Sequence, residues 1–398
     1  MLGAQKISDN PRPLDQYSMD ESNSEHAVAQ QQHLPTNRRL TMHGSSPASW
    51  RHPLTQASDM DGTTLDDGAP SNLAIYISGG IGDGILNMVF VRALADYAGT
   101  PVTLLMTQHE SSLALFRAQP YVKEVVSLKE LSKLQGRSRV AQISSVLAAG
   151  SYDALFLFTF RSHIAAAARL AGIPRRIGYL RWHHPHFSRW LTEQIWVRRK
   201  GTPHPDTHTW LPAMLRKVGC PYEASYPSLE IAPEALNAAA HLTQGLPRMV
   251  GFGLNASAEK RRYAAQAFAQ VARILHERDP DLAFLLCGAS DVRHIAQEIR
   301  AALPPSIRVL DITQDATDIC VSQALIARTL AFATNDSMGM HIAVAHNVPT
   351  IGLFGCSPVM RYAPCLHPLE PSGCPGMDGI SPSVVAEAIW SRLPQTIR

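Results

Sequence analysis

From Asn72 onward, short runs of apolar residues alternate with amphipathic stretches along the chain. The apolar runs, among them LAIYIS at 73–78 and VTLLMT at 102–107, are continuous, which is typical of parallel strands buried on both faces. The amphipathic stretches between them predict helices from about Gly84 and near 109–117. The pattern therefore indicates an α/β fold in which helices cover both faces of a parallel sheet.

The same alternation restarts at RMVGFGLN, residues 248–255, and continues to a last predicted helix at 381–393. Two such units imply two doubly wound sheets facing each other across a cleft, and ligands are expected at the carboxyl ends of their strands. The expected organisation is a first domain at 71–225, a linker at 226–247, a second domain at 248–380 and a C-terminal helix at 381–398.

The composition of the chain indicates an N-terminal tail and the cellular compartment of the protein. Residues 1–70 are rich in Ser, Gln, Pro, Asp and His, with 9 acidic and 5 basic residues, and are expected to form a disordered N-terminal tail. The chain shows no apolar run long enough to span a membrane and no apolar signal core, so a cytoplasmic protein is expected. The six cysteines form no CxxC pair, which favours reduced thiols. A net charge of +3 gives no general argument for a nucleic-acid partner.

The first strand runs into a glycine-rich turn that contains one carboxylate. Gly79, Gly80 and Gly82 allow backbone amides to approach a ligand closely, and Asp83 follows them. A dinucleotide fingerprint needs a third glycine where Ile85 stands, and the chain contains no GxxxxGK[ST] sequence, so nicotinamide, flavin and P-loop sites are disfavoured. Asp83 is either the N-cap of the following helix or a catalytic base, and the two roles are compatible.

A second group of candidate residues follows the first strand of the second unit. The sequence LNASAEKRRY places Lys260, Arg261 and Arg262 where that strand opens into the cleft. A cationic cluster there suits a diphosphate, although a solvated charge run at a helix start is the alternative.

A third group lies in FATNDSMGMHIAVAHNVPTIGLFGCSP. A strand ends at Asp336, and Ser337 begins a helix whose first amides, at Met338 and Gly339, form a predicted anion site. His341 lies one turn into this helix and is either a nucleotide-side contact or a core histidine.

These three pieces, in this order, resemble glycosyltransferase family 9, the heptosyltransferases of lipopolysaccharide core assembly. The resemblance covers roughly residues 72–393. Its motifs are the G-x-G-D turn at 80–83, the lysine at 260, the N-D-[ST]-G-P-M-H motif at 335–341 and a Y-D to R-S segment that ends at Arg161 and Ser162. The sequence departs from the family pattern at Met338 and Gly339, and at Cys356 and Ser357 of the F-G-P-T turn.

The resemblance implies a GT-B architecture of two Rossmann-like domains and an inverting transfer of heptose from ADP-heptose to a lipopolysaccharide core acceptor, without a metal cofactor. It implies that Asp83 is the catalytic base. The donor side would comprise Lys260, Arg261, Asp336, Ser337, Met338, Gly339 and His341.

A basic and aromatic segment at 172–200 is the expected acceptor side. Arg161, Arg175, Arg176 and Arg181 are the candidate contacts to a phosphorylated glycolipid acceptor. Basic and aromatic residues together also fit an anionic membrane surface, and so peripheral contact with the inner membrane, or single-stranded nucleic acid, or simply a solvated excursion. We expect no nucleic-acid partner.

Two clusters have metal-ligand chemistry but weak spacing. His183, His184 and His186 form one, and Cys356, Cys365 and Cys374, with His367 nearby, form the other. Neither supplies a standard motif, so no metal site is expected.

Three other functions stay open at this point. A protein O-heptosyltransferase of the autotransporter type would keep the chemistry and change the acceptor. A sugar-nucleotide epimerase would need no acceptor. A non-catalytic relative would only bind a nucleotide sugar.

Overall fold

The computed structural model describes residues 70–181, 185–197, 207–223, 225–246, 248–313 and 318–394. It describes their side chains except at 181, 185–186, 197 and 207–209. The expected N-terminal tail, residues 1–70, lies outside the described residues apart from Pro70.

The first domain contains a six-stranded sheet whose strand pairs are all parallel, in the order β3-β2-β1-β4-β5-β6. The strand order reverses direction between β1 and β4, as in dinucleotide-binding folds, and ligands bind at such a switch point. The strands are β1 (Leu73–Ile77), β2 (Val102–Met106), β3 (Val122–Ser127), β4 (Ala154–Leu157), β5 (Arg175–Arg181) and β6 (Glu193–Val197).

Helices cover both faces of this sheet because its central strands are apolar on both sides. Leu73, Ile75 and Ile77 pack with α1, α2 and α6, while Ala74 and Tyr76 pack with α4 and α5 on the other face. The helical elements are α1 (Ile81–Ala98), α2 (Glu110–Arg117), α3 (Lys129–Ser132), α4 (Gly136–Ala149), α5 (Ser162–Leu170), the 3₁₀ helix η2 (Pro185–Trp190) and α6 (Thr207–Lys217).

The second domain repeats this plan with a parallel sheet in the order β12-β11-β10-β7-β8-β9. The strands are β7 (Met249–Gly253), β8 (Ala283–Cys287), β9 (Arg308–Asp311), β10 (Ala331–Asn335), β11 (Thr350–Leu353) and β12 (Leu366–Leu369). The helical elements are α7 (Pro233–Leu242), η3 (Glu259–Arg261), α8 (Ala265–Arg278), η4 (Ser290–Val292), α9 (Arg293–Ala302), α10 (Ile319–Ala327), α11 (Met338–Ala345), η5 (Met377–Gly379) and α12 (Pro382–Trp390). The expected α/β fold of two Rossmann-like domains is confirmed, and the last predicted helix corresponds to α12.

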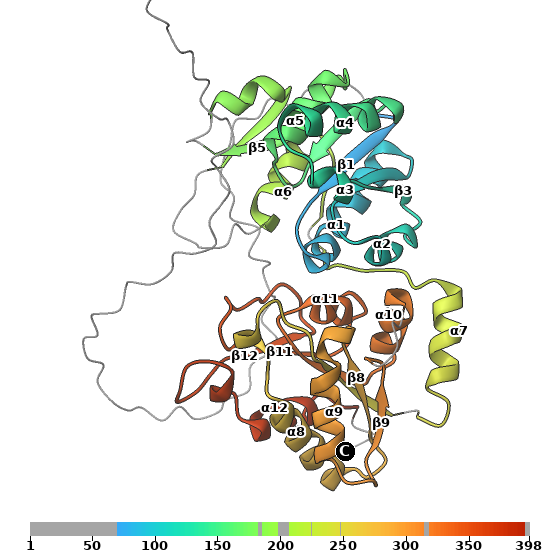
Figure 1. Cartoon of the computed structure of the whole chain (residues 1–398), viewed down its shortest axis with the longest axis vertical. Coiled ribbons are helices and arrows are strands. Elements are labelled where there is room, and N and C mark those ends of the chain that lie inside the picture. The colour runs from blue at the N-terminus through green and yellow to red at the C-terminus, as the bar shows by residue number, and fades with distance from the viewer. Residues whose placement is uncertain are drawn as a thin grey trace, which may run out of the picture.

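The two domains meet through helices that follow the carboxyl ends of strands in each sheet. Helix α1 packs against α11, and α2 packs against α10, as Figure 1 shows for the upper and lower domains. One apolar cluster continues across this boundary, from Ile85 and Phe116 to Leu325 and Ile342. The carboxyl ends of the two sheets therefore face each other.

The expected linker contains helix α7 and is held by both domains at Glu230. Its backbone N–H donates to Oε1 of Gln119 at 2.8 Å, and its carbonyl accepts from Nε2 of Gln323 at 3.1 Å. Both glutamines are buried. Within the described residues, none of the helices combines the length and the apolar character needed to cross a membrane.

Candidate active site

The glycine-rich turn joins β1 directly to α1. Gly80 is the N-cap of α1, so the helix begins at Ile81, three residues earlier than the sequence predicted. Gly79 has a φ of +123°, where a side chain is strained, and a Cβ added there would lie 2.5 Å from Oδ2 of Asp83. The turn therefore requires glycine so that the carboxylate can lie over it.

Asp83 is the third residue of α1 and not its N-cap. Its Oδ2 accepts a hydrogen bond of 2.8 Å from the backbone N–H of Gly80, which fixes the carboxylate at the positive end of the helix. The side chain is exposed. Among the described residues, its Oδ1 has no hydrogen-bond partner, so one oxygen is positioned by the helix and the other is accessible to a ligand.

The loop after β7 is held in place by Asn335, the buried last residue of β10. Oδ1 of Asn335 accepts from the backbone N–H of Tyr263 at 2.9 Å, and Nδ2 donates to the carbonyl of Leu254 at 3.0 Å. These bonds anchor both ends of the segment that carries Lys260 and Arg261. Sequence reasoning placed Asn335 in a motif without giving it a role, because its partners lie more than 70 residues away.

The structure brings two of the predicted donor-side groups together. Nη1 of Arg261 lies 3.7 Å from Oδ2 of Asp336 and donates to Oγ of Ser257 at 3.1 Å. Arg262 is instead paired with Asp291, at 3.3 Å. Lys260 is exposed and forms no ion pair within the described part of the chain. Its charge is therefore available to an anionic ligand.

Helix α11 begins beside this pair. Ser337 is its N-cap, but its hydroxyl does not cap the helix and lies 3.4 Å from Oγ1 of Thr334. The amides of Met338 and Gly339 belong to the first turn, where backbone N–H groups have no partner inside the helix. This end of α11 therefore supplies amide donors and positive potential next to Arg261.

His341 connects the predicted donor side to the first domain. The residue is 5% exposed, and its ring stacks on Tyr362 with ring centroids 5.7 Å apart and has Nδ1 2.7 Å from the Tyr362 hydroxyl. A Cβ added at Gly82 would lie 2.5 Å from Cδ2 of His341. His341 is thus both packed in the protein and located against the turn that contains Asp83. Burial raises the pKa of Tyr362 well above its usual value, so the hydroxyl stays protonated.

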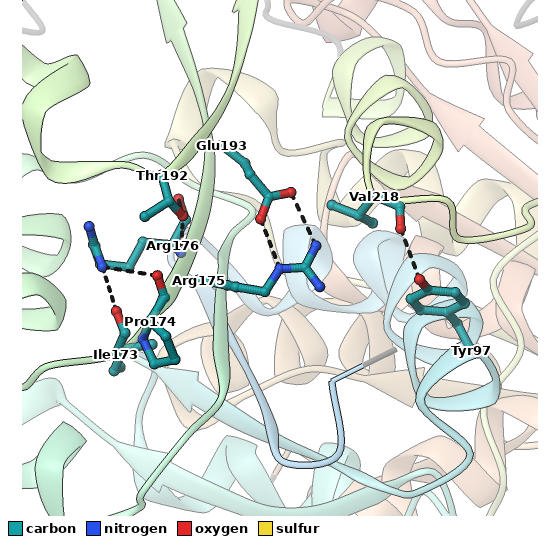
Figure 2. A network of polar contacts seen from close by, with 8 residues as sticks. All are labelled: Tyr97, Ile173, Pro174, Arg175, Arg176, Thr192, Glu193 and Val218. Atoms are coloured by element: carbon teal, nitrogen blue, oxygen red, sulfur yellow. Dashed lines mark hydrogen bonds and ion pairs between the residues drawn. The ribbon is translucent and has the colours of Figure 1, made fainter. Parts of the chain in front are cut away.

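The predicted acceptor-side arginines do not lie together. Arg161 is the exposed N-cap of α5, at the carboxyl end of β4, and Arg181 ends β5; the Arg181 side chain is outside the described atoms. Arg175 and Arg176 begin β5 and therefore lie at the opposite, amino edge of the sheet. Arg175 forms a two-fold pair with Glu193, at 2.9 and 3.2 Å (Figure 2).

Arg139 and His163 lie near Arg161 and were missed by the sequence analysis. Burial first, and then the charges of Arg139 and Arg161, lower the pKa of His163 to about 4. Arg139 belongs to α4, so its proximity to α5 follows from helix packing and leaves no local signal in the sequence.

The structure gives no support to a metal site in its described residues, where no group of three or more His, Cys, Asp or Glu side chains is arranged to hold a metal ion. Cys356 and Cys374 are exposed, and Sγ of Cys365 contacts the carbonyl of Val344 at 3.8 Å. His183 and His184, and the side chain of His186, lie outside the described part of the chain.

Comparison with known protein families finds a match over more than half of the chain. The model of glycosyltransferase family 9 (heptosyltransferase) matches residues 140–372, more than half of the 398-residue chain. No curated protein sequence matches the chain.

Solved structures share the fold at low sequence identity. A glycosyltransferase family 9 protein from Veillonella parvula is 18% identical with a TM-score of 0.67, over 81% of this chain and 96% of that one. The E. coli ADP-heptose LPS heptosyltransferase II is 19% identical with a TM-score of 0.67, over 82% and 99%. E. coli heptosyltransferase WaaC, solved with ADP-2-deoxy-2-fluoro heptose, is 15% identical with a TM-score of 0.59, over 80% and 99%.

Proposed function

Since the chain belongs to glycosyltransferase family 9, the heptosyltransferase family, we propose that this glycosyltransferase transfers a heptose from ADP-heptose to a hydroxyl of a lipopolysaccharide core acceptor. Two E. coli neighbours support the choice of donor, because one is named for ADP-heptose and the other was solved with an ADP-heptose analogue. The acceptor class is supported by the family and by two arginines, Arg139 and Arg161, near the carboxyl ends of β1 and β4.

The observation that carries this proposal is the position of Asp83 relative to the donor-side groups. The turn that holds Asp83 touches α11 at His341, and α11 begins beside Arg261 and Asp336. A general base on one domain and an anion site on the other are therefore brought to the same cleft. An inverting transfer needs this arrangement, because the acceptor attacks from the side opposite the leaving group.

In the proposed reaction, the acceptor hydroxyl oxygen attacks the anomeric carbon of the heptose. The hydroxyl proton passes to the Asp83 carboxylate as the new carbon–oxygen bond forms. The bond between the anomeric carbon and the diphosphate breaks at the same time, and its electron pair leaves on the phosphate oxygen. A positioned base contributes about 10²–10⁴-fold in rate to such a step.

The leaving diphosphate gains negative charge, which the second domain would stabilise. Lys260 has an exposed ammonium group with no ion-pair partner in the described chain, and Met338 and Gly339 offer backbone amides. Fixed donors of this kind contribute about 10²–10³-fold when they are aimed at developing charge. This chemistry uses side chains and amides alone, so we propose that the reaction needs no metal ion.

The acceptor would lie against the first domain, where Arg139, Arg161 and His163 gather near the carboxyl ends of β1 and β4. The guanidinium groups of Arg139 and Arg161 suit the phosphate or carboxylate groups of a core oligosaccharide, whereas His163, with its pKa lowered to about 4, is neutral near pH 7. Because such an acceptor is anchored in lipid, we propose that the protein works at the cytoplasmic face of the inner membrane, without a nucleic-acid partner.

The test is the release of nucleoside diphosphate from a panel of sugar nucleotides, with and without truncated lipopolysaccharide, in buffer with and without EDTA. We expect ADP release from ADP-heptose that depends on the acceptor and is unchanged by EDTA. Interconversion of the sugar nucleotide without acceptor would indicate an epimerase. Release that depends on a protein acceptor would indicate protein O-heptosylation, and tight binding without turnover would indicate a non-catalytic relative.

A further inference from the structure

A buried glutamine lies at the carboxyl end of the strand next to β1. Gln108 follows β2 by two residues, and the register that pairs Ile77 with Met106, carried on by two residues, places it opposite Gly79. Gln108 is 6% exposed, so its amide has lost nearly all of its contact with water. A buried amide is stable only where the protein replaces the lost hydrogen bonds, so both ends of this amide need partners in the protein.

The Gln108 amide binds the glycine-rich turn. Its Nε2 donates to the carbonyl of Gly79 at 3.0 Å and to that of Gly80 at 3.4 Å. Its Oε1 accepts from the backbone N–H of Thr107 at 3.1 Å. The bond to Thr107 sets the orientation of the amide, because only the NH₂ group can donate to the two carbonyls. Gln108 therefore joins the end of β2 to the turn that carries Asp83.

A single peptide unit links Gln108 to Asp83. The carbonyl to which Gln108 donates at 3.0 Å and the N–H that donates to Oδ2 of Asp83 at 2.8 Å belong to the peptide between Gly79 and Gly80. The C=O and N–H groups of a trans peptide point in opposite directions, so the two side chains hold this peptide from its two ends. A hydrogen bond to the carbonyl also polarises the N–H group, which strengthens its bond to the carboxylate.

The two glycines make this restraint necessary. Gly79 has a φ of +123°, and rotating the peptide by half a turn would change the φ of Gly80 from −73° to a positive value, which glycine adopts readily. The rotated peptide would direct a carbonyl oxygen at the Asp83 carboxylate in place of an N–H group. Steric limits alone therefore do not hold the orientation that Asp83 needs. The NH₂ group of Gln108 does so, because it binds the carbonyl of the observed orientation and would face an N–H in the rotated one.

The position of Gln108 is fixed by the packing of the elements on both sides of it. Strand β2 pairs with β1 and β3, and α2 packs against β3 and against α10 of the second domain. Figure 1 shows α2 at the end of the first domain that faces the second domain. The glutamine is therefore a firm support for the turn, whose glycine backbone has more freedom of its own.

We propose that Gln108 is a positioning residue for Asp83: it holds the Gly79–Gly80 peptide in the orientation that directs an N–H group at the carboxylate. This inference rests on the proposed function and adds a residue to the same reaction. Glutamine suits the role because it donates a hydrogen bond without carrying a charge. A cationic side chain in its place would favour the ionised carboxylate and so weaken Asp83 as a base.

The test is a double-mutant cycle between Gln108→Met and Asp83→Asn, with acceptor-dependent nucleoside diphosphate release as the activity. Methionine has nearly the shape of glutamine and has no N–H donor. The matched control is Gln119→Met. Gln119 is also a buried glutamine, located beyond the other end of α2, and its Nε2 donates to the carbonyls of Leu115 and Glu230 at 2.9 and 3.1 Å. Unfolding by heat is recorded for each variant.

Gln108→Met should lower kcat about tenfold and leave the KM for the donor unchanged, because the donor site is proposed to lie in the second domain. In the Asp83→Asn background the carboxylate that the peptide positions is gone. Adding Gln108→Met there should therefore lower kcat by less than about twofold. Gln119→Met should change kcat by the same factor in both backgrounds.

Gln108→Glu is the second variant, for the case that Gln108→Met loosens the end of β2. Glutamate keeps the oxygen that accepts from Thr107 and replaces the NH₂ group by an oxygen. At about pH 8, well above the ordinary glutamate pKa of about 4.3, this oxygen repels the two carbonyls and favours the rotated peptide. The kcat should therefore fall further than in Gln108→Met, by on the order of 10²-fold.

The amide proton of Gly80 gives a readout that does not depend on turnover. In protein with isotope-labelled glycine, its bond to a carboxylate shifts this proton downfield in the NMR spectrum, and Asp83→Asn should move the signal upfield. Gln108→Met should also move it upfield, whereas Gln119→Met should leave it in place. If wild type shows no acceptor-dependent release, the proposed function fails, and this signal still tests the role of Gln108.

Three results would overturn the inference. An unmoved Gly80 signal in Gln108→Met would show that Gln108 does not hold the peptide. An equal loss of kcat from Gln108→Met with and without Asp83 would show that it acts on the fold and not through the base. A smaller loss in Gln108→Glu than in Gln108→Met would show that the donated hydrogen bond is not what matters. The proposed function would stand in each case if wild type is active and Asp83→Asn is not.

Discussion

His341 of α11 lies directly against Gly82 of the glycine-rich turn, across the boundary between the two domains. A Cβ at Gly82 would be 2.5 Å from Cδ2 and 3.0 Å from Nε2 of this imidazole, which is closer than real Cβ contacts allow. The absence of a side chain at Gly82 therefore sets how closely the turn that carries Asp83 approaches α11.

Replacing Gly82 by alanine should separate these two elements. The added methyl group would push the turn away from α11 while the helical backbone stays favourable. Because a misplacement of about 1 Å can cost about 10²-fold in rate, kcat/KM for Gly82→Ala should fall by ~10–10². Steady-state kinetics with purified protein would measure this loss.

A double-mutant cycle supplies the control. If the clash with His341 is the cause, G82A should cost much less when it is made in an H341A background, because alanine leaves room for the methyl group. Equal losses in the two backgrounds would contradict the contact as the explanation.

Tyr362 should contribute to kcat/KM because it positions His341. In Tyr362→Phe the stacked ring remains and the hydroxyl 2.7 Å from Nδ1 is lost, so kcat/KM should fall about threefold to tenfold. The pKa of Tyr362 is raised well above its ordinary value of 10.0, so the ratio of wild type to variant should stay constant from pH 7 to about pH 10.

Tyr97→Phe is the matched control for that experiment. The Tyr97 hydroxyl donates to the carbonyl of Val218 at 2.9 Å, within the first domain and outside the candidate active site (Figure 2). Its loss should lower stability slightly and leave kcat/KM unchanged. A ratio for Tyr362→Phe that matched this control would mean that Tyr362 has no positioning role.

Asn335 should be important for stability as well as for the donor site. Asn335→Ala leaves the backbone N–H of Tyr263 and the carbonyl of Leu254 without their partner, and both lie in a buried environment. Such orphaned groups cost about 1–3 kcal/mol each, so the free energy of unfolding should fall by about 2–6 kcal/mol.

Urea denaturation would test this value, with Asn237→Ala as the control. Asn237 is exposed on α7, and its replacement should change the free energy of unfolding by less than about 0.5 kcal/mol. The KM for the donor should rise in Asn335→Ala alone, because the loop that carries Lys260 loses its anchor. An unchanged KM would show that the loop is fixed by other contacts.

Much of the fold could be predicted from the sequence because its cause is local. Continuous apolar runs such as β1 and β7 can only be buried on both faces, which already indicates parallel sheets covered by helices. The start of α1 was misplaced by three residues, because Ile81 and Gly82 are poor helix-start signals and the helix begins inside the glycine-rich turn.

The parts of the site that could not be predicted depend on register and on domain packing. The sequence analysis predicted that Arg175 contacts an acceptor, yet the pairing of β5 with β6 brings it to Glu193, 18 residues further along the chain. The contact of Gly82 with His341 joins residues from different domains, so no periodic pattern in the sequence predicts it. Individual motifs were recognisable, whereas the distances between them were not. The roles assigned to the site residues stay predictions.

Two histidines should make the protein less stable at mildly acidic pH. The pKa of His163 is lowered to about 4 by burial and by Arg139 and Arg161, and that of His346 is lowered to about 4 by burial. Below pH 6.5, the ordinary pKa of histidine, both side chains bind a proton in the unfolded chain but stay neutral in the folded protein until about pH 4. The free energy of unfolding should therefore have its full value above pH 6.5. It should fall by about 1–2 kcal/mol for each histidine as the pH decreases towards 4.

Denaturation curves recorded between pH 7 and pH 4 would test this expectation. His163→Asn and His346→Asn should each make the free energy of unfolding less dependent on pH than in wild type, since each removes one histidine that is protonated only in the unfolded chain. Curves for wild type and variants that run parallel would contradict it.

The central claim is that Asp83 is the base that accepts the proton of the acceptor hydroxyl. The most direct test compares Asp83→Asn with Asp96→Asn, the same substitution at an exposed position on the same helix. The predicted result is a fall in kcat of about 10²–10⁴-fold for Asp83→Asn, with unchanged donor affinity by calorimetry and a wild-type kcat for Asp96→Asn. A wild-type kcat in Asp83→Asn, or an equal loss in both variants, would contradict the account.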